Sequence, residues 1–443
     1  MNRASSTAEL ARRTAWPLDR IKDHSSKIGS GITPKGGATS YLNAGVPLLR
    51  SQNVHFDGLR LDDVAFIGED THAEMAGTQL KAGDVLLNIT GASIGRCTFI
   101  PEGFGEGNVN QHVCIIRPSA SLDHRFLTYC LAAPWGQDQI LSSFTGASRQ
   151  GLGQRDLGEI QIPLPTRPDQ ERIVAYLDAS CAAIDAAVAA KRRQLETLDS
   201  LRTTIITRAV TRGLDVSVEL KDSGVAWIGH LPLHWKVEKL KYVTSLIVDG
   251  THFTPTYLPD GVPFLRVTDV QEKEIDLERV KYISEEEHQL LCKRAKAEYG
   301  DILLSKNGTI GVVKVVNWAW EFSFFVSLCL LRPLKNLNAH YFSYYFDSDL
   351  VDQQLFESSK RTSVTNLHLI KIRELLIALP PIDEQEKIIL YLDAKCAELV
   401  RLKKNITDQI TKLENYRRSL IHECVTGQRR VTEADIKRVQ AHG

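Results

Sequence analysis

The chain contains one long pattern twice. The sequence Gln-Glu-Arg-Ile at residues 170–173 stands between a Leu-Pro pair and Tyr-Leu-Asp-Ala, and Gln-Glu-Lys-Ile at 385–388 stands in the same context 215 positions later. The offset holds without a gap as far as Val210 and Val425. A repeat of this period is one large structural unit used twice, not a solenoid of small repeats. A protein with two similar halves is suited to a target that also has two halves.

Each repeat includes a long stretch with hydrophobic residues at alternating steps of four and three. This heptad spacing is that of a coiled-coil seam, and it predicts long helices over residues 166–214 and 381–428. The seam positions are Leu177, Cys181, Ile184, Val188, Lys191, Leu195, Leu198, Arg202, Ile205 and Ala209 in the first copy, and Leu392, Cys396, Leu399, Lys403, Ile406, Ile410, Leu413, Arg417, Leu420 and Cys424 in the second. So long a helix cannot bury its whole seam on one small domain, and we expect the two helices to pack antiparallel on each other. The alternative is that each helix covers its own domain.

Local signals mark the expected ends of these helices. Pro168 suits a first helical turn, where its missing N–H needs no partner. Asp383 precedes Glu386 by three residues, which is the spacing of a capping box. Gly213 and Gly427 follow the last apolar positions and predict the two C-termini.

The rest of the chain forms two globular segments, residues 1–165 and 215–380, and a C-terminal tail at 429–443. Short β-branched runs bounded by Gly, Pro and Asp predict strands in both segments, and short helices are expected after Arg117-Pro118 and Arg332-Pro333. The prediction is an α+β fold. Two similar mixed α/β domains alternate with two long antiparallel coiled-coil helices in a pseudo-two-fold arrangement.

The two globular segments share strand sequences but not the segments between them. Gly-Asp-Val-Leu-Leu at 83–87 returns as Gly-Asp-Ile-Leu-Leu at 300–304, and Cys-Ile-Ile-Arg-Pro at 114–118 returns as Cys-Leu-Leu-Arg-Pro at 329–333. Residues 58–63, in contrast, have no likeness to residues 272–277. The pattern predicts one fold with two different surfaces, as expected of two domains that recognise different targets.

Composition does not identify the class of partner, but it bears on the cellular location of the chain. Lys plus Arg and Asp plus Glu number 54 each, but DNA binding depends on local basic patches and not on the sum. The eight cysteines form no Cys-x-x-Cys pair, and the matched pairs Cys114/Cys329 and Cys181/Cys396 are expected to be buried apolar positions. With no signal-peptide core and no apolar run approaching a membrane span, we expect a cytoplasmic protein without membrane contact.

Motifs for bound cofactors are missing from the sequence. There is no Gly-x-x-x-x-Gly-Lys-(Ser/Thr) for ATP and no Asn/Asp-Pro-Pro-aromatic motif. The glycine-rich sequence at 103–107 precedes a strand pattern, not the helix that a phosphate-binding loop needs. The thirteen histidines show no metal-ligand spacing. We therefore expect neither a cofactor nor a metal site in this chain.

Three motifs resemble those of the specificity subunits of type I restriction-modification systems, and along the chain they follow that family's order of recognition domain, helix, recognition domain, helix. The first is Pro-x-x-x-x-Gln-Glu-(Arg/Lys)-Ile opening a long helix, at 165–173 and 380–388. The second is the lead-in from Asp222 to Trp235, and the third is the Gly-Asp-(Val/Ile)-Leu-Leu strand with the glycine-containing loop after it. The likeness covers nearly the whole chain. The first domain departs from it, because only Trp-Pro-Leu at 16–18 stands where the second has the full lead-in.

The resemblance implies that residues 1–165 and 215–380 are target recognition domains, each reading one half of an asymmetric, bipartite double-stranded DNA site. It implies that the helices at 166–214 and 381–428 act as a spacer, and that two methyltransferase (modification) subunits dock around them. A restriction subunit with translocase and nuclease activity can join. The chain itself is then not an enzyme: its partners use S-adenosylmethionine to methylate adenine, and ATP with Mg²⁺ for restriction.

Polar loops at equivalent places in the two domains are the candidate DNA contacts, because Arg, Lys, Asn, Gln, Ser and Thr recognise base edges and phosphates. They are Arg50, Gln52, Asn53, Asn88, Thr90, Ser93, Ser148, Arg149 and Gln150 in the first domain, and Arg266, Thr268, Lys306, Asn307, Thr309, Lys360, Arg361 and Ser363 in the second. For any single residue an ordinary polar turn is an equal alternative, and Arg50 and Arg266 are equally suited to structural ion pairs.

Two other classes of function stay open at this point. The chain could be a scaffold with two interaction domains on a coiled coil and no DNA recognition, or an enzyme in its own right. The missing cofactor and metal motifs argue against the enzyme. A methylation pattern with two separate half-sites, each assigned to one domain, would separate DNA recognition from scaffolding.

Overall fold

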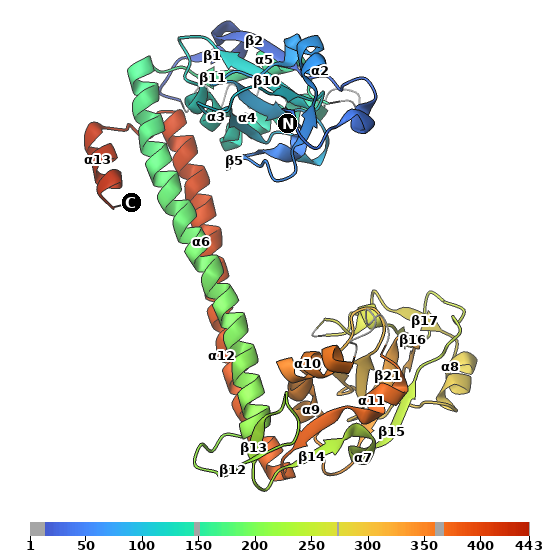
Figure 1. Cartoon of the computed structure of the whole chain (residues 1–443). Helices are drawn as coiled ribbons and strands as arrows, with labels where there is room; N and C mark the ends of the chain where they lie inside the picture. The colour runs from blue at the N-terminus through green and yellow to red at the C-terminus, as the bar shows by residue number, and fades with distance from the viewer. Residues whose placement is uncertain (1–13, 146–150, 273, 359–366, 443) are drawn as a thin grey trace. The chain divides into compact units, whose positions relative to one another are not determined.

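The computed structural model describes residues 14–145, 151–272, 274–358 and 367–442. The chain divides into two compact units, one formed by Met1–Arg192 with Thr407–Gly443 and the other by Arg193–Ile406. Each unit holds one globular domain and opposite ends of the two long helices, α6 (Arg167–Arg212) and α12 (Ile382–Val425) (Figure 1).

The first unit is built around a four-stranded antiparallel sheet with strand order β2-β10-β7-β8. A second sheet, β6-β3-β9, contains the parallel pair β3 and β9. The strands are β1 (Leu18–Arg20), β2 (Ser25–Ser30), β3 (Val46–Leu49), β4 (Val54–His55), β5 (Gly58–Leu59), β6 (Ala65–Ile67), β7 (Val85–Asn88), β8 (Cys97–Phe99), β9 (Asn108–Val109), β10 (Val113–Pro118) and β11 (Gln161–Pro163), and the helices are α2 (Glu69–Glu74), α3 (His124–Ala132), α4 (Pro134–Thr145) and α5 (Gln154–Gly158).

The second unit repeats both sheets. Its four-stranded antiparallel sheet has the order β15-β21-β18-β19, and β16 and β20 form the parallel pair of the sheet β17-β16-β20. The strands are β12 (Leu220–Asp222), β13 (His230–Pro232), β14 (Lys236–Lys239), β15 (Thr244–Asp249), β16 (Val262–Leu265), β17 (Lys281–Ile283), β18 (Ile302–Ser305), β19 (Val313–Val315), β20 (Ser323–Phe324), β21 (Leu328–Pro333) and β22 (Leu376–Leu379), and the helices are α7 (Leu240–Val243), α8 (Glu285–Cys292), α9 (Ala339–Phe346), α10 (Asp349–Ser358) and α11 (Leu369–Glu374). The predicted pair of similar mixed domains is confirmed.

Buried apolar runs explain why these segments form central strands. All four residues of β7 and all four of β18 are buried, as are the first four residues of β10 and of β21. Such runs are typical of strands covered on both faces. The short helices predicted after the Arg-Pro pairs are present as α3 and α9, each with an Asp or Asn side chain that caps its first turn.

The two long helices pack antiparallel within each unit. In the first unit Asp185 of α6 pairs with Arg417 of α12 at 3.1 Å, and Arg192 pairs with Glu414 at 3.2 Å. In the second, Asp199 pairs with Lys403 at 2.6 Å. Along α6 the partner numbers fall as the residue numbers rise, which requires opposite chain directions. Exposed pairs of this kind add little stability, so the buried seam holds the helices together.

The ends of the helices match the glycine predictions but not the predicted capping box. Gly213 and Gly427 have positive φ values of 69° and 74°, as expected for residues that terminate helices. The prediction for Asp383 was wrong, because α12 already begins at Ile382 and the N–H of Glu384 donates to the carbonyl of Pro381. Asp383 instead lies in the first turn, where its charge favours the positive end of the helix dipole.

A tryptophan lies against each terminal glycine. A Cβ at Gly213 would lie 3.2 Å from the Trp235 ring, and one at Gly427 would lie 2.5 Å from Nε1 of Trp16. The carbonyl of Thr426 also accepts a 2.9 Å hydrogen bond from the N–H of Ala15. Trp16 therefore packs against the glycine that ends a long helix, as Trp235 does, although only a short part of the lead-in motif is present around Trp16.

One 18-residue window of α6 is long and apolar enough to cross a membrane by length and composition alone. The expectation that no apolar run approaches this length was therefore wrong by this measure. The window is rich in alanine, and 44% of it is buried inside the structure. Helices in protein cores pass the same test, so the finding is weak evidence for a membrane span.

Candidate nucleic-acid interface

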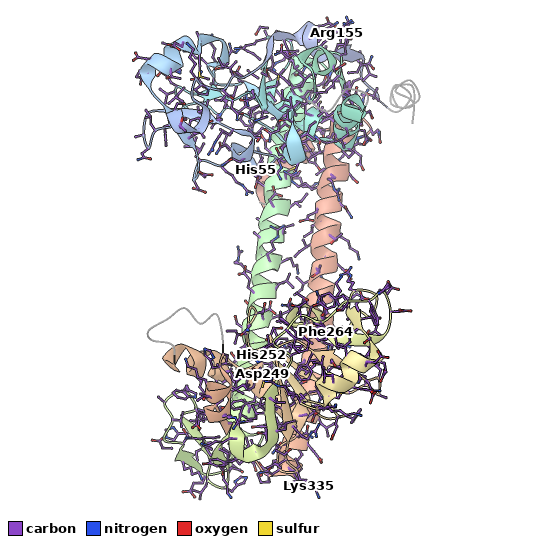
Figure 2. The ribbon with its side chains drawn as sticks, turned by 90° about the vertical axis from the view of Figure 1, so that its right-hand side faces the viewer. His55, Arg155, Asp249, His252, Phe264 and Lys335 are labelled. Carbon is purple, nitrogen blue, oxygen red and sulfur yellow. The ribbon has the colours of Figure 1, made fainter. Side chains whose placement is uncertain are left out.

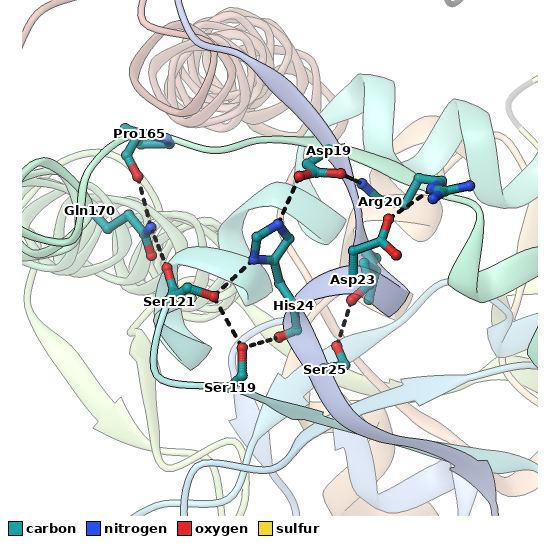
Figure 3. Close-up of polar contacts among 10 residues, drawn as sticks. Asp19, Arg20, Asp23, His24, Ser25, Ser119, Ser121, Pro165 and Gln170 are labelled. Carbon is teal, nitrogen blue, oxygen red and sulfur yellow. Dashed lines mark hydrogen bonds and ion pairs between the residues drawn. The ribbon is translucent and has the colours of Figure 1, made fainter.

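The glutamine of the repeated Gln-Glu motif joins each domain to its helix. The buried amide of Gln170 donates to the carbonyls of Ser121 (3.0 Å) and Pro165 (2.9 Å) and accepts from the N–H of Asp123 (2.7 Å). Figure 3 shows this amide between Pro165 and Ser121, whose hydroxyl continues the network to His24. Because the Gln170 side chain itself is buried, these contacts require both the donor and the acceptor of a glutamine.

Gln385 makes the same three contacts in the second unit. It donates to the carbonyls of Asn336 (2.8 Å) and Pro380 (2.9 Å) and accepts from the N–H of Asn338 (2.8 Å). The motif therefore fixes where the helix starts relative to the domain. It does not supply a surface for DNA.

The Gly-Asp and Arg-Pro motifs form one ion pair with a buried carboxylate in each domain. Asp84 receives two hydrogen bonds from Arg117, at 2.6 and 2.7 Å, and Asp301 receives two from Arg332, at 2.9 and 2.8 Å. These bonds raise the pKa of both arginines. Bidentate pairing orients the strands that carry the residues, so these motifs are also scaffold.

Arg50 and Arg266 hold the loops in which they lie. Arg266 makes two 3.0 Å hydrogen bonds to Asp269, which raise its pKa. Arg50 donates to the carbonyl of Asp63 at 2.8 Å, and its N–H donates to Oδ1 of Asn53 at 2.9 Å. Arg50 also forms an ion pair with Asp63 at 3.5 Å, so the structure favours the ion-pair alternative for both arginines.

Three candidate DNA contacts are buried in the described structure. Asn53 and Asn88 are 1% and 0% exposed, and their amides donate to backbone carbonyls of neighbouring loops. Lys306 is 5% exposed and forms an ion pair with Asp249 at 3.3 Å. Asn53 and Asn88 lie beside strands as expected, but their amide nitrogens donate to backbone carbonyls, so this structure places both residues in the scaffold.

The other candidates fall into three groups. Gln52, Thr268 and Thr309 are exposed, whereas Ser93, Thr90 and Asn307 are half-buried. Thr90 and Asn307 lie in equivalent loops, after β7 and β18. Ser148, Arg149, Gln150, Lys360, Arg361 and Ser363 lie outside the described residues.

The sequence alone did not single out the charged residues around Lys306. The carboxylate of Asp249 is also 2.7 Å from Arg294 and 3.3 Å from His252. Burial raises the pKa of Asp249, but the hydrogen bond from Lys306 and the nearby positive charges outweigh burial and lower it. Asp249 and His252 are three residues apart, but Arg294 and Lys306 come from two other segments, so no spacing in the sequence joins all four residues. No group of three or more His, Cys, Asp or Glu side chains able to hold a metal occurs in the described part of the chain.

Comparison with known proteins identifies the sequence family of this chain. The family model for the type I restriction modification DNA specificity domain matches residues 66–197 and 232–412, which is more than half of the chain. The chain belongs to this family. It is 21% identical over 426 residues to the EcoKI specificity subunit of Escherichia coli strain K12, covering 93% of this chain and 89% of that one. It is 23% identical over 333 residues to the EcoBI specificity subunit of Escherichia coli, covering 72% and 69%.

Solved structures share the fold of this DNA specificity chain. The HsdS subunit from Thermoanaerobacter tengcongensis has a TM-score of 0.53 at 18% identity, with 93% of this chain and 97% of that chain covered. A chain from a structure of complex assembly in a type I R-M system has a TM-score of 0.72, again at 18% identity and with the same coverage. The domains and helices described above are thus those of the family's specificity chains.

Proposed function

We propose that each globular domain reads one half of a bipartite, asymmetric site in double-stranded DNA and that the paired helices set the spacing between the halves. The observation that carries this proposal is the contrast between repeated scaffold and unrepeated loops. Gln170 and Gln385 make the same three contacts, whereas the equivalent loops carry Thr90 in one domain and Asn307 in the other. Two domains that are attached to their helices in the same way but have different surfaces are suited to two different half-sites.

We further propose that this chain is the non-catalytic, cytoplasmic member of a complex, without membrane contact. Two modification subunits would dock around α6 and α12 and use S-adenosylmethionine to methylate one adenine in each half-site. A restriction subunit that uses ATP and Mg²⁺ can join. The chain itself needs no cofactor. Its net charge of zero supports a division of labour, because non-specific DNA affinity depends on phosphate neutralisation, which the partners can supply.

A domain exchange tests this function. Residues 1–165 are replaced by the equivalent segment of a relative with a different site, the chimera is assembled with its modification subunits, and methylated adenines are mapped by sequencing. We expect one half-site to change while the other half and the spacing stay the same. A methylation pattern unaffected by the exchange would contradict DNA reading and favour a scaffold.

A further inference from the structure

One end of the central sheet is built alike in both domains, and we call this end the corner. Three backbone hydrogen bonds, each from an N–H to a carbonyl, define it. In the second domain they run from Gly250 to Leu328 (3.3 Å), from Lys306 to Ser327 (2.9 Å) and from Leu367 to Lys306 (2.8 Å). In the first domain they run from Gly31 to Val113 (3.0 Å), from Ile89 to His112 (3.0 Å) and from Leu152 to Ile89 (2.9 Å). The backbone frame of the two corners is therefore the same.

A glycine secures the frame in each case. A Cβ at Gly31 would lie 2.0 Å from the carbonyl oxygen of Val109, and one at Gly250 would lie 2.1 Å from that of Phe324. No side chain fits at that distance, so the close approach of two backbone segments requires glycine. Differences between the two corners must come from the side chains around this frame.

The side chains give the two corners different charges. In the second domain the side chains of Lys306 and Asp249 are 6% and 7% exposed, and Arg294 and His252 share the same carboxylate. One negative group thus faces two permanent positive charges and a histidine. At the equivalent places the first domain has Ser30 and Ile89, which are uncharged.

The second corner also contains an unsatisfied acceptor. Oδ1 of Asn307 is buried and accepts no hydrogen bond from the described residues. It lines an open pocket of about 470 Å³ together with Asp249, His252, Lys306 and His368. Buried polar atoms in native proteins are nearly always bonded, so this atom calls for a donor from water or a ligand. Thr90, at the equivalent place, is instead hydrogen-bonded to His112 at 2.6 Å.

The opposite end of the same sheet has no such excess charge. A pocket there is lined by Glu298, Asp301, Arg332 and Lys335, and the first two carboxylates pair with Arg332. The carbonyl of Asn336 and the N–H of Asn338 at this end bind Gln385 of α12, so helix attachment occupies it. Figure 2 shows Asp249 and His252 together and well separated from Lys335.

We propose that the corner formed by Asp249, His252, Lys306, Asn307 and His368 is the surface with which the second domain recognises bases. The inference rests on the proposed function that the domains read DNA. The Asn307 amide would take the base edge with an exocyclic amino group, as on adenine or cytosine, because its Oδ1 needs a donor. The paired Lys306 and Asp249 position the Asn307 loop, and His252 and His368 line the pocket. The equivalent corner, around Thr90, is the recognition surface of the first domain.

Paired variants test the corner in the complex with the modification subunits. Asn307→Ala and Thr90→Ala change equivalent positions, and Asp249→Ser with Lys306→Ile gives the second corner the residues of the first without leaving a buried charge unpaired. Methylation of a randomised-site DNA library, followed by sequencing, gives the base preference at every position. The exposed Tyr299→Ala, at the opposite end of the sheet, is the control.

We expect N307A to reduce discrimination at one position of one half-site by about ten- to hundredfold, the range for loss of a bidentate base contact. T90A should affect only the other half-site, and the double variant should alter the same half-site as N307A. Unchanged preferences in all three variants with normal melting temperatures would overturn the corner assignment. If a domain exchange still changes one half-site in that case, the proposed function stands, and if it does not, the function fails as well.

Discussion

The hydroxyl of Tyr344 donates a 2.5 Å hydrogen bond to Oδ1 of Asp393, which joins the second globular domain to α12. Tyr129 and Asp178 make the same bond in the first unit, at 2.8 Å. Burial, followed by the bond to Asp393, raises the pKa of Tyr344, so the phenol remains a donor across the physiological range. These bonds and the glutamine contacts thus help to tie each domain to its helix.

Tyr344→Phe should lower the free energy of unfolding by about 1.5–3 kcal/mol, because it removes a hydrogen bond to a charged acceptor and changes little else. Urea denaturation followed by circular dichroism measures the change. Tyr299→Phe is the matched control, since this tyrosine is 78% exposed, and should leave stability unchanged. Equal losses in the two variants would show that the Tyr344 bond does not stabilise the domain.

Asp301→Asn should destabilise the second unit more strongly. Asp301 is almost fully buried, and removing its charge leaves Arg332 without its bidentate partner. We expect a loss of about 3 kcal/mol, the lower end for a buried pair, because Arg332 keeps 28% of its side-chain surface exposed. The double variant Asp301→Leu with Arg332→Met should recover part of the loss. A double variant no more stable than D301N would contradict an unpaired charge as the cause.

The sequence predicted the elements whose signals are local and periodic. The heptad positions gave the helices, and the positive φ of Gly213 and Gly427 confirms their ends. The prediction of a capping box at Asp383 was wrong because the same spacing also occurs inside the first turn of a helix. The role of Trp16 could not be predicted, because its partner Gly427 lies at the other end of the sequence and no local pattern joins them.

The candidate site was predictable by place but not by contact. Polar residues after strands were expected at the DNA surface, yet Asn53 and Asn88 are buried and bonded to the backbone. Residue type cannot distinguish these cases, because the same amide satisfies a loop or a base. The cluster around Asp249 needs the sheet to bring separate segments together, so only the structure shows it.

Acid should weaken the contacts that α11 makes with the end of β14 and with α7. Glu374 accepts hydrogen bonds from Lys239 (2.5 Å) and Lys241 (2.7 Å), and these bonds lower its pKa to about 2. A carboxylate with a lowered pKa contributes fully above its ordinary value of 4.5, and the contribution disappears as the pH falls towards 2. Glu374→Gln should therefore flatten the stability profile in this window, measured by denaturation at a series of pH values. Glu278→Gln, at an exposed position, should leave the profile unchanged.

A matched insertion in both helices tests the proposed spacer. One heptad is inserted after Arg192 in α6 and one after Ile406 in α12, at the boundary between the compact units. The pairs Asp185–Arg417 and Asp199–Lys403 then stay intact within their units. Seven residues add about 10 Å of helix at about 1.5 Å per residue, which corresponds to about three base pairs at roughly 3.4 Å each. A whole heptad also preserves the facing seam.

We expect the spacer of the methylated site to lengthen by about three base pairs while both half-sites keep their sequence. Insertion of the heptad in α6 alone is the control: it leaves α12 short, misaligns the seam and should abolish methylation. Altered half-sites at an unchanged spacing would show that the helices do not set the distance. The insertion would then have changed recognition by the domains instead, although it leaves the contacts within each domain intact. The length of the paired helices and the spacing between the DNA half-sites should thus change together.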